Sequence, residues 1–192
     1  MTRVIAGQAG GRRLQVPPGN GTRPTSDRAR EGLFASVMSE FGDLAGVHVI
    51  DLYAGSGALG LEALSRGAAG VLLVESDARA AAVIKANVTA LGLPGATVAT
   101  DRVERLLARQ KDEREHADLV FADPPYAVTD DAVAQMLTLL GDGWLADGAL
   151  VVVERATRSG AFEWPPGYDE GKSRRYGEAT FRYGWYGSHL GA

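Results

Sequence analysis

The 192-residue chain contains no cysteine. Disulfides, thiolate catalysis and cysteine-based zinc sites are therefore excluded together. The three histidines, at positions 48, 116 and 189, lack metal-ligand spacing, so we expect no metal. The chain also lacks a run of 18 apolar residues and the apolar segment of a signal peptide. We therefore expect a cytoplasmic protein without a membrane partner.

Nothing in the composition is unusual for a soluble globular protein. Hydrophobic residues make up 45% of the chain and charged residues 23%, which is an ordinary balance. A chain of 192 residues is long enough for one domain and a small appendage. No feature of the sequence indicates an oligomer, so a monomer is the default expectation.

Lysine is absent from the first 30 residues, where six arginines stand against the single acid Asp27 although the whole chain has a net charge of −4. The planar guanidinium group suits phosphate and base recognition, so this basic end predicts contact with nucleic acid. For the arginines near residue 27 the alternative is a solvated helix start, salt-bridged to Asp27 and Glu31. The candidate RNA-binding residues are Arg3, Arg12, Arg13, Arg23, Arg28 and Arg30.

The chain before residue 20 has the pattern of a small β-unit. Residues 3–6 and 12–16 are β-prone and flank a glycine-rich stretch, which predicts a hairpin. Two prolines and two glycines within residues 17–21 predict a flexible connection after it. We therefore divide the chain into a basic hairpin arm that contacts RNA, residues 1–20, and a main domain, residues 21–192.

Strand and helix patterns alternate in the main domain. Thr25 or Ser26 can cap a first helix whose apolar residues recur at helical spacing. The alternation that follows predicts an α/β fold with five parallel strands, and the segment 168–186 predicts a hairpin at one edge of the sheet. The expected strands are 47–52, 71–75, 96–100, 118–122 and 149–154, and the expected helices are 58–66, 78–91, 103–111 and about 130–140.

A glycine-rich loop follows the first of these strands. Gly55, Gly57 and Gly60 have the G-x-G-x-x-G spacing, and Glu75 ends the next strand, as in dinucleotide sites. Asp51 does not suit a pyrophosphate, because its negative charge would lie beside phosphate. S-adenosylmethionine fits better, with its cations near Asp51, its carboxylate on backbone N–H groups and its ribose on Glu75. The predicted cofactor-binding residues are Asp51, Tyr53, Gly55, Ser56, Gly57, Glu75, Ser76 and Asp101.

Other interpretations of these residues stay open. Asp101 could accept a hydrogen bond from the adenine amino group, cap the following helix, or do both. Asp51 alone could cap a neighbouring helix, and the loop could be a tight turn that binds nothing.

Asp123, Pro124, Pro125 and Tyr126 directly follow the apolar residues 118–122. The prolines stiffen this turn and donate no N–H, which leaves carbonyl groups to accept hydrogen bonds. The Asp123 carboxylate and the Pro124 carbonyl could bind both protons of an exocyclic base amine while Tyr126 stacks on the base. We therefore predict these four residues as the catalytic motif of an amine methyltransferase.

Several segments together resemble a known family. Residues 51–57 (DLYAGSG) and 123–126 (DPPY) are similar to the class I S-adenosylmethionine-dependent amino-methyltransferases. Residues 23–31 (RPTSDRARE), residues 57–68 (GALGLEALSRGA) and Asn87 further resemble the RsmD family of bacterial 16S ribosomal RNA guanine-N2 methyltransferases. This resemblance extends over nearly the whole chain.

The resemblance implies a Rossmann-like, seven-stranded methyltransferase fold with an N-terminal RNA-contacting β-unit. It also implies S-adenosylmethionine as cofactor and a guanine of 16S rRNA in the assembling 30S particle as substrate. The Asp-Pro-Pro-Tyr motif is shared with adenine-N6 enzymes that act on DNA, so DNA methylation is an alternative. A nicotinamide-dependent oxidoreductase and a noncatalytic RNA-binding factor are alternatives from other classes.

Overall fold

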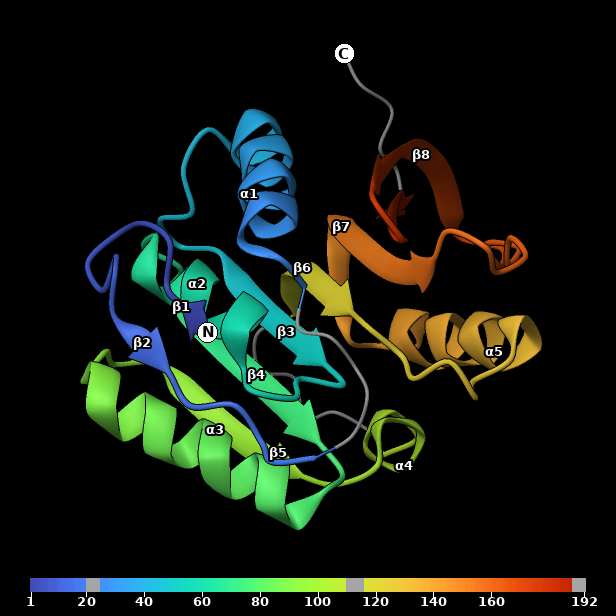
Figure 1. Cartoon of the computed structure of the whole chain (residues 1–192). Helices are drawn as coiled ribbons and strands as arrows, with labels where there is room; N and C mark the ends of the chain where they lie inside the picture. The colour runs from blue at the N-terminus through green and yellow to red at the C-terminus, as the bar shows by residue number, and fades with distance from the viewer. Residues whose placement is uncertain (20–24, 110–115, 188–192) are drawn as a thin grey trace.

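A seven-stranded sheet forms the centre of the protein in a computed structural model that describes residues 1–19, 25–109 and 116–187 (Figure 1). Its strands are β3 (His48–Leu52), β4 (Gly70–Glu75), β5 (Ala96–Thr100), β6 (Ala117–Ala122), β7 (Leu145–Ala156), β8 (Tyr168–Tyr176) and β9 (Ala179–Tyr186). The strand order is β5-β4-β3-β6-β7-β9-β8. Strands β3 to β7 are parallel, and the β8–β9 hairpin pairs antiparallel with β7. The predicted α/β sheet and its closing hairpin are confirmed.

Helices cover both faces of this sheet. The helices are α1 (Asp27–Phe41), α2 (Ala58–Ser65), α3 (Ala78–Leu91), α4 (Val103–Leu107) and α5 (Asp130–Gly141). One apolar cluster joins the sheet to α1, α2 and α3, and a second joins its other face to α4 and α5 (Figure 1). Along β3, Ile50 and Leu52 belong to the second cluster. Because side chains alternate along a strand, Asp51 projects toward α2.

The helix α4 is shorter than expected. The sequence predicts a helix over residues 103–111, whereas α4 ends at Leu107, and residues 110–115 lie outside the described chain. The indole N–H of Trp144 donates to the Leu107 carbonyl at 3.0 Å. A tertiary hydrogen bond therefore satisfies a carbonyl at the end of this helix.

The N-terminal hairpin is docked on the main domain. Its strands, β1 (Thr2–Arg3) and β2 (Arg13–Leu14), pair antiparallel, and they are shorter than the predicted runs 3–6 and 12–16. Val4 and Leu14 are buried in the same apolar cluster as α1 and α2. The expectation of an arm that stands apart is thus corrected, because the hairpin shares the core of the main domain. The expected flexible connection falls largely on residues 20–24, outside the described residues.

A buried glutamate of α2 binds this hairpin. Glu62 is 0% exposed and accepts hydrogen bonds from the backbone N–H groups of Ile5 and Ala6 at 2.8 and 3.0 Å. Arg66 donates to the same carboxylate at 2.8 Å, and the Arg30 guanidinium lies 3.9 Å from it. No sequence pattern distinguishes Glu62, since an acid in a helix usually faces solvent.

The described residues contain neither a membrane-spanning helix nor a cluster of metal ligands. Within residues 1–19, 25–109 and 116–187, none of the helices combines the length and apolarity needed to cross a membrane. The same residues contain no cluster of three or more histidine, aspartate or glutamate side chains suited to a metal ion.

Candidate active site

The carboxyl ends of the parallel strands bring the predicted site residues to one edge of the sheet. Leu52 lies opposite Val74 on one side and Ala122 on the other. The residues that follow these strand ends, including Glu75 and Asp123, therefore lie along the same edge. Ligands of open α/β sheets bind outside this edge.

The glycine loop connects β3 to α2 in a conformation that needs small residues. Gly57 is the N-cap residue of α2 with φ 81°, a value that L side chains rarely adopt. A Cβ atom on Gly60 would lie 2.8 Å from Val71 and 2.9 Å from Leu73, so Gly60 lets α2 pack closely on the sheet. Tyr53 has φ 58° without being glycine, a strained conformation of the kind found at functional sites.

Asp51 lies below this loop and is 2% exposed. Its carboxylate accepts a hydrogen bond from the Gly60 N–H at 2.9 Å, at the start of α2. The pKa of Asp51 is raised to about 8, mainly by burial and also by the charge of the nearby Glu75, against the lowering effect of the Gly60 hydrogen bond. When Asp51 is ionised, its carboxylate therefore lacks a positively charged partner to compensate its charge.

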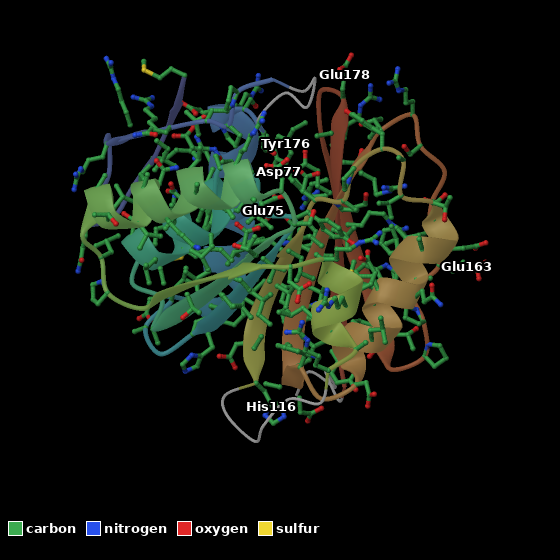
Figure 2. The ribbon with its side chains drawn as sticks, turned by 90° about the horizontal axis from the view of Figure 1, so that it is seen from below. Glu75, Asp77, His116, Glu163, Tyr176 and Glu178 are labelled. Atoms are coloured by element: carbon green, nitrogen blue, oxygen red, sulfur yellow. The ribbon has the colours of Figure 1, made fainter. Side chains whose placement is uncertain are left out.

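Glu75 and Asn87 hold the backbone of the loop and its surroundings. Glu75 accepts hydrogen bonds from Gly55 N–H at 2.8 Å and from Asp77 N–H at 3.0 Å. Figure 2 shows Glu75 and Asp77 close together at the start of α3. Asn87 is 2% exposed and donates to the Ser56 carbonyl at 3.0 Å. Ser76, which follows Glu75 in the chain, is exposed.

Asn87 also ties the glycine loop to the hairpin. Its side chain accepts from Gln15 N–H at 2.8 Å and donates to the Gln15 carbonyl at 3.0 Å. One buried amide thus joins the chain after β2 to the Ser56 carbonyl. In the sequence only the family resemblance points to Asn87, because its partners are far apart along the chain.

Asp101 and Tyr53 already have partners within the protein. The Asp101 carboxylate accepts from Arg102 N–H at 2.8 Å and forms an ion pair with Arg109 at 2.6 Å. The N-cap residue of α4 is Arg102, one position later than the predicted Asp101. The Tyr53 hydroxyl donates to Glu104 at 2.9 Å. Contacts of Asp101 with adenine and of Tyr53 with the cofactor stay predictions.

The Asp-Pro-Pro-Tyr turn forms after β6 as a stiff projection. Asp123 N–H donates to the Leu52 carbonyl at 3.4 Å, and Val128 N–H donates to the Pro125 carbonyl at 2.9 Å. No described residue donates to the Pro124 carbonyl, which leaves it able to accept from a ligand. The Tyr126 side chain is 64% exposed, and the Arg158 guanidinium lies 5.9 Å from its ring centroid.

Asp123 has an unusual electrostatic environment. The residue as a whole is exposed, but its carboxylate is partly desolvated by the protein around it. This partial desolvation, followed by the charges of Glu154 and Asp51, raises the pKa of Asp123 well above its ordinary value, and Arg155 lowers it. Desolvation also raises the pKa of Glu154. The Thr25 hydroxyl opposes this rise, because it donates a hydrogen bond to the Glu154 carboxylate at 2.8 Å. In the sequence Glu154 is only the last residue of a predicted strand, with no sign of a role in the site.

The predicted RNA-binding arginines differ in their accessibility. Arg30 is 1% exposed and donates to the Arg3 carbonyl and to Asp27 at 2.8 and 2.7 Å. The prediction of RNA contact is therefore wrong for Arg30, which is a buried structural residue. Arg12 binds the carbonyls of Ala90 and Leu91 at the end of α3. Arg3, Arg13 and Arg28 are exposed, and Arg23 lies outside the described residues.

The raised pKa of Asp51 predicts a pH-dependent stability. Between about pH 4 and pH 8 the folded carboxyl stays protonated while the unfolded carboxyl, with an ordinary value of 3.8, ionises. This difference lowers the free energy of unfolding as the pH rises through that range. We expect Asp51→Asn to remove this loss, so that its stability relative to the parent protein rises up to about pH 8 and then levels off. Denaturant unfolding of the two ligand-free proteins at several pH values measures this difference in the free energy of unfolding.

The exposed acid Asp131 on α5 provides the control. Asp131→Asn should follow the pH dependence of the parent protein, since this side chain is in solvent. Parallel pH curves for the parent protein and Asp51→Asn would contradict the prediction.

Comparisons with known proteins agree with this geometry. The model of a family described as conserved hypothetical protein 95 matches residues 2–185. The chain is 37% identical over 181 residues to ribosomal RNA small subunit methyltransferase D of Escherichia coli (strain K12), covering 94% of this chain and 87% of the relative. The corresponding methyltransferase D of Haemophilus influenzae is 36% identical over 154 residues, covering 79% of this chain and 77% of the relative.

A solved structure is also similar over almost its full length. The Escherichia coli protein YhhF, described as a methyltransferase, superposes with a TM-score of 0.84 at 33% identity and covers 98% of this chain and 99% of that one. The likeness thus includes the N-terminal hairpin and the closing β8–β9 hairpin as well as the parallel strands.

Proposed function

The chain belongs to the RsmD family of ribosomal RNA methyltransferases, and on this premise we propose that it transfers a methyl group from S-adenosylmethionine to the N2 amine of a guanine in 16S rRNA. The fold is that of the class I methyltransferases, with the strand order β5-β4-β3-β6-β7-β9-β8. The observation that carries the proposal is the placement of the Asp123 turn and the glycine loop at one edge of the sheet.

The residues around the glycine loop fit this cofactor. Asp51 is buried and short of positive charge, which a ligand with an ammonium and a sulfonium group would provide. Glu75 retains lone pairs for ribose hydroxyls after its two backbone hydrogen bonds. When bound, S-adenosylmethionine supplies a methyl group that is electrophilic because it is attached to a positively charged sulfur.

The Asp-Pro-Pro-Tyr turn positions the nucleophile. A base amine is weakly nucleophilic because its lone pair is delocalised into the ring. The Asp123 carboxylate and the Pro124 carbonyl accept hydrogen bonds from the two N–H groups of this amine. They thereby direct its lone pair toward the methyl group, while Tyr126 stacks on the base. Positioning of this kind supplies most of the rate. As the amine takes the methyl group, the bond from the methyl carbon to sulfur breaks and S-adenosylhomocysteine leaves. The amine gives up one proton after or during attack, and Asp123 or water accepts it.

Mass spectrometry of ribosomal RNA from a deletion strain tests the proposed function. We expect one methylguanosine of 16S rRNA to be missing, and the purified protein to restore it in immature small-subunit particles with labelled S-adenosylmethionine. Methyl transfer to adenine in duplex DNA, with none to these particles, would instead support the DNA alternative. Tight binding of NAD without response to S-adenosylhomocysteine would refute methyl transfer.

We also expect the exposed arginines near the N-terminus to bind RNA phosphates. Arg13 and Arg28 are exposed, and reversing their charge in R13E/R28E should weaken binding of 16S rRNA. The slope of log affinity against log salt should fall by about 0.7–0.9 for each phosphate that the variant no longer binds. Filter binding at several salt concentrations measures both quantities.

The matched control reverses two exposed arginines on the other face of the sheet, Arg102 at the N-cap of α4 and Arg105 within it. R102E/R105E should bind RNA more tightly than R13E/R28E. Charge reversal is preferable to deletion of the hairpin, because deletion would remove Val4 and Leu14 from the core. An unchanged salt slope in R13E/R28E would refute the assignment.

A further inference from the structure

A second carboxylate lies beside Asp123 at the end of β7. The strands β6 and β7 are parallel, and Ala122 lies opposite Val153. The next residues, Asp123 and Glu154, are therefore neighbours across the two strands. Phe121 and Val152, two positions earlier, both pack in the cluster beneath α1. Since side chains alternate along a strand, both carboxylates project toward the α1 side of the sheet.

Glu154 is held in place but keeps the capacity to bind a ligand. The Thr25 hydroxyl, just before α1, donates to its Oε2 atom at 2.8 Å. A carboxylate has about four lone-pair sites on its two oxygens, so further donors can bind. Glu154 is half-buried, and it is the charged member of a closely packed, otherwise apolar group of side chains next to the catalytic turn. The described residues of this group are Leu33, Leu59, Phe121, Ala122, Val152, Glu154 and Phe181.

The pair of carboxylates favours a ligand that brings several hydrogen-bond donors. Two like charges at one site repel each other, and each N–H that points between them relieves this repulsion. The Watson–Crick edge of guanine presents the N1–H and the two N2–H bonds side by side. Adenine presents an unprotonated N1 next to its N6 amine, so a carboxylate facing N1 would meet a lone pair.

We propose that Glu154 is a specificity-determining residue that accepts the N1–H of the target guanine, while Asp123 and the Pro124 carbonyl hold its N2 amine. This inference rests on the proposed function and deepens it, because it gives the site a means to select guanine over adenine. The Thr25 hydroxyl fixes the orientation of the Glu154 carboxylate, which connects the segment before α1 to base selection.

The base 2-aminopurine separates recognition of N1 from recognition of the amine. It has the same exocyclic amine on C2 as guanine, but its N1 carries no proton. The experiment uses small-subunit particles reconstituted on 16S rRNA with either guanine or 2-aminopurine at the methylated position. We expect the parent enzyme to prefer guanine by about 10- to 100-fold in kcat/KM, the effect of one hydrogen bond to a charged group.

Glu154→Gln should reduce this preference to within about threefold. The amide has the size of the carboxylate and can turn its oxygen toward the N1–H of guanine or its nitrogen toward the N1 of 2-aminopurine. Thr25→Val, which keeps the carboxylate and removes the hydroxyl that orients it, should lower the preference by a smaller factor. Both variants are first compared with the parent protein in melting temperature and in S-adenosylhomocysteine affinity.

Glu163→Gln is the matched control, because Glu163 is exposed and lies at the periphery of the molecule (Figure 2). It should retain the full preference for guanine. An unchanged preference in folded Glu154→Gln and Thr25→Val would overturn the role of Glu154 alone. A parent enzyme that methylates guanine in none of these particles would overturn the proposed function and this inference with it.

Discussion

Replacement of Asp123 by alanine should lower kcat by about 10³-fold and leave the affinity for S-adenosylhomocysteine within about threefold of the parent value. The reason is that the carboxylate contacts the substrate amine at the end of β6, whereas the predicted cofactor residues follow β3 and β4. Single-turnover methylation of small-subunit particles and calorimetry measure the two quantities separately.

The stability of this variant provides a further check. Asp123 lies close to Glu154, and partial desolvation and this neighbouring charge raise its pKa. Removing one of two repelling carboxylates should not lower the melting temperature. Asp131→Ala, at an exposed position of α5, should retain full activity. Loss of cofactor binding in Asp123→Ala would mean that Asp123 belongs to the cofactor site.

The largest effect on stability is expected for Glu62→Ala, about 3–5 kcal/mol. The substitution would leave Arg30, which is 1% exposed, with less compensation for its charge. It would also remove the acceptor of two backbone N–H groups, those of Ile5 and Ala6, and buried unpaired donors are costly. Denaturant unfolding gives the free energy, and the melting temperature should fall by about 10 °C.

The control for this experiment is Glu31→Ala, an exposed acid on α1 for which a change within about 0.5 kcal/mol is expected. Glu62→Gln keeps the volume of the side chain and one acceptor oxygen, and it should be less destabilised than Glu62→Ala. Equal stabilities of Glu62→Ala and Glu31→Ala would show that the hairpin does not depend on Glu62.

Periodicity and turn chemistry predicted most of the fold. The predicted helix 78–91 has the observed bounds, Ala78–Leu91, and in the structure Asp77 caps its start and Gly92 ends it. The glycine loop was predicted from glycines whose conformation or close packing excludes other residues. These signals are local, so they are present in a single sequence.

The failures concern contacts between distant segments. Arg30 belongs to an arginine-rich segment of the kind that contacts nucleic acid. In the folded chain, however, its guanidinium lies between Asp27 and Glu62. The docking of the hairpin depends on Glu62 and Asn87, whose partners in the N-terminal segment lie more than 50 positions away. Glu154 became a candidate only when the register of β6 and β7 placed it beside Asp123. No periodic pattern contains such information.

The docked hairpin also bears on the order of events during protein synthesis. Apart from Asp27 and Arg30, which bind Arg3, its hydrogen-bond partners in the main domain lie 56 to 79 residues further along the chain, from Glu62 to Leu91. The hairpin must therefore wait, without most of its final contacts, until the chain through α3 has emerged from the ribosome. An N-terminal tag that folds quickly would occupy this interval next to the hairpin, whereas a C-terminal tag would not.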